Sequence, residues 1–222
     1  MTAVRATVVV GKVFGKVHAG CINIIATASV TGENGNPVNF TRALNLHNRV
    51  FDTGTKFLCA GAFSARNIVS IVYFTGTRRP GDDELLWIRR SQDLADQIEA
   101  HSKEKNRCDG ADVRVQEFLY RLSRGERHNE LLTQATARLD DDSPIDRAEI
   151  QYISGSIDDD EFEVAVQAGK LVRARCGGYF EGMWFAELEK KPAAAKKFYQ
   201  RLLETGETDC RASLVYAKKF QF

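Results

Sequence analysis

The pattern of hydrophobic and polar positions changes about one third of the way along the chain. In residues 1–80, β-branched and aromatic residues dominate short runs that turn residues separate, which is typical of β-strands. The glycines and asparagines of residues 31–37 are expected to close a hairpin. Five strands are expected: Ala3–Val17, Cys21–Val30, Val38–Leu46, Lys56–Ser64 and Asn67–Phe74. So many strands in so short a stretch predict a small barrel or sandwich.

Beyond the boundary at Pro80 and Gly81, the period becomes mostly that of helices. Pro192 and Gly206 flank the last helix in the order that helix ends prefer. Four helices are expected: one capped by Asp82 or Asp83 that runs to about Lys105, one that follows Asp109-Gly110 and is terminated by Gly125, one from Arg127 to Leu139, and one from Ala193 to Glu204. Shorter apolar runs predict further strands at Ala148–Ser154, Phe162–Val166, Leu171–Cys176 and Ala212–Phe222. The order of elements predicts an α+β protein.

Charge follows the same division. Residues 1–81 hold nine basic and two acidic residues, a balance of +7, whereas residues 82–222 hold 22 basic and 28 acidic residues, a balance of −6. We therefore expect a basic, β-rich domain over 1–80, a helical segment over 81–142 and a mixed β/α element over 143–222 that packs with it. The net charge of +1 excludes a uniformly basic protein of the histone type.

Composition narrows the class of protein further. No apolar run has the roughly 18–20 residues that a membrane helix needs, and the N-terminus lacks a signal-peptide pattern, so we expect a soluble intracellular protein in the cytoplasm, nucleoid or nucleus. The five cysteines are widely spaced and include no C-x-x-C pair, which predicts reduced thiols. Glycine loops for nucleotides, nucleophile elbows and metal-binding histidine spacings are absent from the sequence, so we expect no cofactor, no metal and no catalytic residue.

Basic residues alternate with aromatic ones in the first 80 residues. Cations that follow phosphates and rings that stack on bases are the combination that single-stranded nucleic acid needs. In a strand, Phe40 and Arg42 would share one face. Core packing is the better interpretation for Phe57, Phe63 and Phe74, whereas Phe14, Phe40 and Phe51 fit either role.

The segment Asp52-Thr-Gly-Thr-Lys-Phe-Leu-Cys-Ala-Gly-Ala-Phe-Ser64 resembles the fourth-strand region of OB-fold single-stranded DNA-binding proteins. In that family a glycine-containing turn introduces a hydrophobic strand, which a glycine and another hydrophobic position follow. Asn39–Phe51 is similar to the third strand and connector, and Asn67–Phe74 to the closing strand. The resemblance covers residues 3–76, and it implies an OB-like barrel, a preference for DNA and no catalytic residue.

These observations predict a non-enzymatic protein that binds single-stranded nucleic acid in replication, recombination or repair, as a homo-oligomer without a membrane partner. The residues expected at phosphates are Lys12, Lys16, Arg42, Arg49, Lys56 and Arg66, and those expected to stack are Phe14, Phe40 and Phe51. A self-assembling coat-like or scaffold-like protein is the alternative, because the basic and acidic regions are complementary. A third possibility is a metal-dependent nuclease that uses Asp140–Asp142 or Asp158–Glu161.

Overall fold

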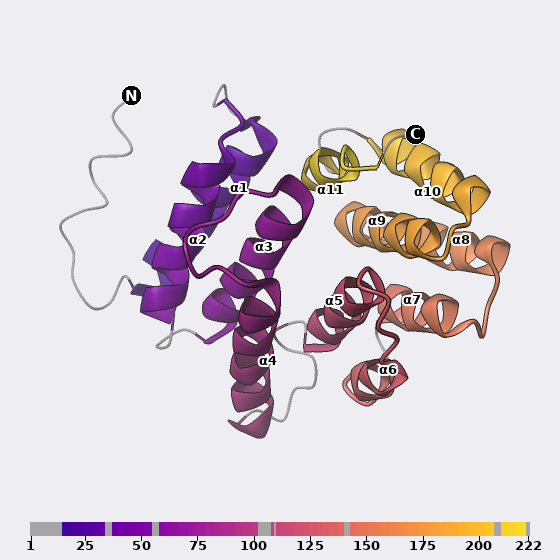
Figure 1. The fold of residues 1–222 in the computed structure, drawn as a ribbon, viewed down its shortest axis with the longest axis horizontal. Helices are drawn as coiled ribbons and strands as arrows, with labels where there is room; N and C mark the ends of the chain where they lie inside the picture. Colours follow the sequence, from indigo (N-terminus) through magenta and orange to yellow (C-terminus); the bar gives the residue numbers. More distant parts are fainter. Residues whose placement is uncertain are drawn as a thin grey trace. The chain divides into compact units, whose positions relative to one another are not determined.

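Helices form all the regular structure in the residues that the computed structural model describes, which are 15–33, 37–54, 58–101, 108, 110–139, 143–206 and 210–220 (Figure 1). The helices are α1 (Gly15–Thr31), α2 (Phe40–Gly54), α3 (Leu58–Thr75), α4 (Glu84–His101), α5 (Gly110–Leu122), α6 (Asn129–Thr136), α7 (Pro144–Ser154), α8 (Asp159–Gln167), α9 (Val172–Leu188), α10 (Pro192–Thr205) and α11 (Arg211–Ala217). The α+β prediction is therefore wrong, because the described residues contain neither strands nor an OB-like barrel.

Within the described residues, the expected strands failed because short apolar runs do not distinguish a buried helix from a buried strand. Residues 3–14 of the first expected strand lie outside the described residues. Cys21–Val30 lies inside α1, and both Lys56–Ser64 and Asn67–Phe74 fall largely within α3. The runs predicted as strands after residue 143 also lie mostly in helices, α7, α8, α9 and α11. The expected hairpin between the second and third strands is instead a connection between two helices, α1 and α2.

The chain divides into two compact units, residues 1–98 and 99–222. In the first unit, α1, α2 and α3 pack against one another. The beginning of α4 joins them, because the Ser91 hydroxyl donates to the Ala62 carbonyl of α3 at 2.9 Å. Asp83 caps α4 as the sequence predicted, its carboxylate accepting the Leu86 N–H at 2.8 Å.

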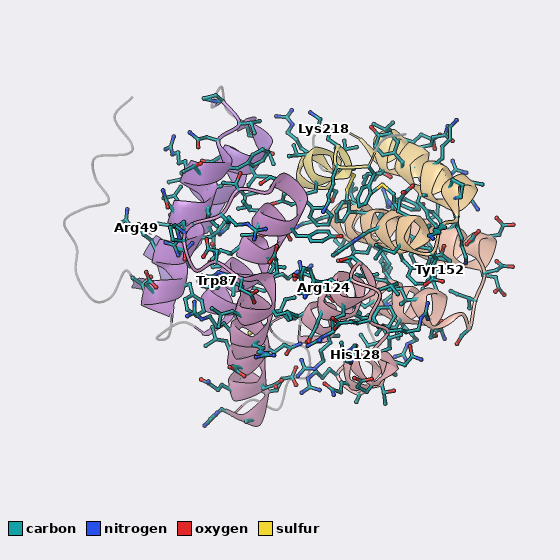
Figure 2. The ribbon with its side chains drawn as sticks, in the orientation of Figure 1. Arg49, Trp87, Arg124, His128, Tyr152 and Lys218 are labelled. Carbon is teal, nitrogen blue, oxygen red and sulfur yellow. A yellow bond between two sulfur atoms is a disulfide. The ribbon has the colours of Figure 1, made fainter. Side chains whose placement is uncertain are left out.

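The second unit is built from helix pairs, α5 with α6, α7 with α8 and α9 with α10, followed by α11. The helices predicted after Asp109-Gly110 and over 193–204 are confirmed by α5 and α10, although α5 ends at Leu122, before the expected terminator Gly125. Four rings from α7, α8, α9 and α10 form the centre of this unit. Tyr152 stacks on Phe162 at 4.6 Å between ring centroids, and Phe185 and Phe198 meet Tyr152 edge-on. Tyr152 is labelled among these helices in Figure 2.

Four of the five cysteines are oxidised. Cys176 of α9 and Cys210, just before α11, form a disulfide, and Cys59 and Cys108 are also disulfide-bonded. Cys21 is free. The prediction of reduced thiols is therefore wrong. That prediction rested on the wide spacing of the cysteines, whereas a disulfide joins cysteines that are close in space and need not be close in sequence.

Candidate anion-binding site

Helix α2 carries the candidate site on its exposed side. Asn39 starts the helix, since its side-chain oxygen accepts the Arg42 backbone N–H at 2.8 Å. Ala43, Leu44 and Val50 are buried against the neighbouring helices. An open groove of about 530 Å³ runs along the other side of the helix, lined by Asn39, Thr41, Arg42, Asn45, Leu46 and Arg49.

Two guanidinium groups define this groove. Arg42 and Arg49 are exposed and lie seven residues apart, or about 10 Å along the helix axis. Neither forms an ion pair with an acidic side chain in the part of the chain that the structure describes. Asn45 lies between them on the same exposed arc, and Asp52 lies one turn beyond Arg49. Figure 2 shows Arg49 on the outer side of α2. The arrangement offers paired cations and amide groups to an extended anion.

A buried polar group fixes the orientation of α2. The Asn23 side-chain oxygen of α1 lies 3.1 Å from His47 Nδ1 of α2 and accepts the Ser64 hydroxyl of α3 at 2.8 Å. Because that oxygen is an acceptor, Nδ1 must carry the ring proton in this contact. Burial lowers the pKa of His47 to about 4, so the ring is neutral at physiological pH. Three helices thus share one neutral hydrogen-bonded hub, and the groove lies on the opposite side of α2.

Of the predicted site residues whose side chains the structure describes, only Arg42 and Arg49 lie together in the groove. Arg66 lies in α3, half-buried, and Lys16 lies in α1. Lys12, Phe14 and Lys56 lie outside the described residues.

The predicted stacking rings of α2 face away from the groove. Successive helical residues are rotated by about 100°, so Phe40 and Arg42 lie on nearly opposite sides of the helix rather than on one face of a strand. Phe51 is half-buried and meets Trp87 edge-on at 5.0 Å, while the Arg90 guanidinium lies over both rings. Phe51 therefore anchors α4 to α2.

The groove also contains residues that the sequence analysis missed, namely Asn39, Thr41, Asn45 and Leu46. A signal for them existed. Ala43, Leu44, His47 and Val50 repeat at helical spacing, which would have placed Thr41, Asn45 and Arg49 on one exposed arc.

The acidic run Asp158–Glu161 has a structural role at the start of α8. The Asp158 carboxylate accepts hydrogen bonds from the backbone N–H groups of Asp160 and Glu161. The Glu161 carboxylate in turn accepts the backbone N–H of Asp158, which completes a capping box. Asp159 accepts the Tyr152 hydroxyl at 2.8 Å. No cluster of metal-ligating side chains occurs among the described residues, and Asp140–Asp142 lie outside them.

Comparisons with protein-family models, curated proteins and solved structures found no match. The resemblance to OB-fold single-stranded DNA-binding proteins is therefore overturned, because no family supports it and the described residues are helical. Within those residues, no helix has the length and apolar character needed to cross a bilayer.

Proposed function

We propose that the protein is a non-enzymatic nucleic-acid-binding protein that holds the phosphate backbone along the exposed side of α2. The observation that carries this proposal is the pair Arg42 and Arg49, which line one open groove without an acidic partner among the described residues. Asn45 between them adds an amide that can donate to a phosphate or sugar oxygen. A linear polyanion fits this geometry better than a single phosphate, because the two arginines are two helical turns apart.

The proposed binding mode differs from base stacking. Phe51 packs on Trp87, and Phe40 lies on the side of α2 away from the groove, so neither ring is expected to stack on bases. Binding should therefore depend on salt and discriminate little between single strands and duplexes. Two phosphate contacts predict a slope of log K against log salt of about −1.4 to −1.8.

Fluorescence anisotropy with labelled single-stranded DNA, duplex DNA and RNA at several salt concentrations tests the proposal. The double variant Arg42→Ala/Arg49→Ala should weaken binding at least tenfold and flatten the salt slope by roughly 1.4 to 1.8. The matched control is Arg89→Ala/Arg173→Ala, which removes the same charge from two exposed arginines of α4 and α9. This control should bind nearly as the wild type does.

Three results would contradict the proposal: no binding at low salt, equal weakening in the control, or binding to a sulfated polysaccharide without binding to nucleic acid. Light scattering of the free protein at two salt concentrations tests the self-assembly alternative. An oligomer that dissociates in salt and that Arg42→Ala/Arg49→Ala abolishes would show that the basic groove serves assembly instead.

The disulfides also bear on where the protein works. Disulfides persist in secreted proteins and at cell or virion surfaces, and they are rare in the reducing cytosol. We therefore propose an oxidising environment instead of the reducing interior expected from the sequence. Alkylation of the protein as it is isolated should modify one cysteine, Cys21. Modification of all five would restore the cytoplasmic prediction.

A further inference from the structure

A buried carboxyl, that of Glu149, lies on α7, the helix that packs against α5 and α9 in the second unit. Glu149, in the middle of α7, is only 6% exposed. Its side chain is hydrogen-bonded to that of Glu181 on α9, and Asp112 of α5 and Asp146 of α7 also act on it electrostatically. All three neighbours are acidic. The other oxygen of Glu149, Oε1, is buried and has no hydrogen-bond partner.

Arginines of the adjacent helices have acceptors of their own. Arg114 of α5 donates from Nη1 to the Gly110 carbonyl at 2.8 Å. Arg138, which follows α6, forms an ion pair with Glu99 at 3.2 Å. Burial is the largest influence on the Glu149 carboxyl, and the negative charges of its acidic neighbours act in the same direction.

Glu163 of α8 is a second buried glutamate in the same unit, 8% exposed, and its neighbours differ from those of Glu149. Its two oxygens lie 2.6 Å from Lys197 Nζ and 2.5 Å from Arg201 Nε. Burial alone would raise the pKa of Glu163, but the bonds from Lys197 and Arg201 outweigh burial and lower it. Glu163 is thus ionised and paired.

Glu149 has the opposite behaviour. Burial is the main reason that its pKa is raised, and repulsion from Glu181, Asp112 and Asp146 raises it further. Two carboxylates in contact at a buried site cannot both ionise without a large cost, whereas a protonated carboxyl donates a short hydrogen bond to its ionised neighbour.

We propose that Glu149 and Glu181 share one proton across the packing of α7 against α9, and that loss of this proton as the pH rises loosens the helix pairs of the second unit. The pair is a pH-sensitive latch, closed under mildly acidic conditions. This inference is independent of the α2 groove. The sign follows from the unfolded state, where a free glutamate ionises near pH 4.5 while native Glu149 still keeps its proton. Stability is therefore greatest below that pH and falls as the pH rises through the native value.

Unfolding of the second unit between pH 5 and pH 8 tests the latch, with Glu149→Gln as the main variant. Incorporated fluorotryptophan gives one fluorine NMR signal for each unit, because Trp87 lies in the first and Trp184 in the second. Glutamine keeps the shape of a protonated glutamate and cannot ionise. Glu149→Gln should raise the Tm of the Trp184 signal at pH 8 by roughly 3–8 °C and reduce its fall with pH.

Glu163→Gln is the matched control, since it removes a buried carboxylate that has two cations. It should lower the Tm at both pH values. A lower Tm for Glu149→Gln at pH 8 with an unchanged pH dependence would overturn the proposal. Infrared spectroscopy of the wild type supplies a readout that does not depend on whether the variant folds. The C=O stretch of a protonated carboxyl should be present under mildly acidic conditions, where a free glutamate is already ionised, and should fade as the pH rises. Its absence throughout would equally overturn the proposal.

Discussion

Between α1, α2 and α3 of the first unit, the buried polar side chains are neutral, whereas the second unit buries carboxyls and a guanidinium. The hub of the first unit joins Asn23, His47 and Ser64. The second unit buries Arg114, Glu149 and Glu163. A neutral hub satisfies several groups without removing a charge from water, while each buried ionisable group requires a partner or a proton.

The difference gives the two units opposite responses to pH. His47 keeps its neutral form only above its lowered pKa of about 4, so acid destabilises the first unit. Glu149 keeps its proton only below its raised pKa, so alkali destabilises the second unit. Each unit therefore has a pH range in which its own buried group is satisfied, and the ranges overlap under mildly acidic conditions.

The largest expected effect on stability comes from removing the hydrogen-bonded hub of the first unit. Asn23→Leu leaves the buried His47 Nδ1–H and the Ser64 hydroxyl without their shared acceptor. Each unsatisfied buried group costs roughly 1–3 kcal/mol, so the first unit should lose about 4 kcal/mol of its free energy of unfolding. Denaturant titration at pH 7, followed at fluorotryptophan Trp87, measures this loss.

Asn45→Leu is the control for that loss, because it makes the same chemical change on the exposed side of α2. Its effect on stability should stay within about 0.5 kcal/mol. If the two variants destabilise the first unit equally, the hub contributes no more than an exposed asparagine, and the contrast between the units fails.

Acidification gives the next largest effect. The free histidine value of 6.5 falls to about 4 in the native state, so the first unit should lose about 3 kcal/mol as the pH drops from 7 to 4. His47→Gln keeps an N–H donor near Asn23 but cannot titrate. In this variant, the decrease in the free energy of unfolding between pH 7 and pH 4, measured at Trp87, should be smaller by most of the roughly 3 kcal/mol that His47 contributes. An unchanged loss would show that other groups cause the acid sensitivity.

Helices with a clear period or with terminal signals were the part of the fold that the sequence predicted. Pro192 and Gly206 delimited α10, and Asp83, one of the two residues expected to cap α4, accepts the Leu86 N–H there. In contrast, α1 and α3 are apolar on most sides, so no period separates them from strands. In α7 the helical spacing begins at Ile145, which the predicted strand at 148–154 left out.

For the candidate site, the sequence indicated which basic residues to consider, but it did not indicate the geometry that places them. The structure places Arg42 and Arg49 in one groove, and their role at an anion stays a prediction. Phe40 was expected beside Arg42, because a period of two residues places them on one face, whereas the helical period of 3.6 places Phe40 on the other side of α2. The disulfides were missed because pairing depends on tertiary proximity alone.

The smallest effect concerns α9, whose glycines let α8 approach closely. A Cβ at Gly182 would lie 2.4 Å from Cε1 of Phe162. Phe162 is fully buried and stacked on Tyr152, so its ring has little room to move. Gly182→Ala should therefore destabilise the second unit by about 2 kcal/mol despite the better helix propensity of alanine. Denaturant titration followed at Trp184 measures the change.

Gly177→Ala supplies the matched comparison within the same helix. A Cβ at Gly177 would have no heavy atom within 4 Å, so only the backbone entropy changes. That variant should stabilise the second unit by about 0.5–1 kcal/mol. Opposite signs for two glycines five residues apart would show that contact with Phe162, rather than helix propensity, determines the residue at position 182. Stabilisation by both variants would mean that the Phe162 ring shifts to make room for the new methyl group. The aromatic centre of the second unit would then be more adaptable than its buried polar groups.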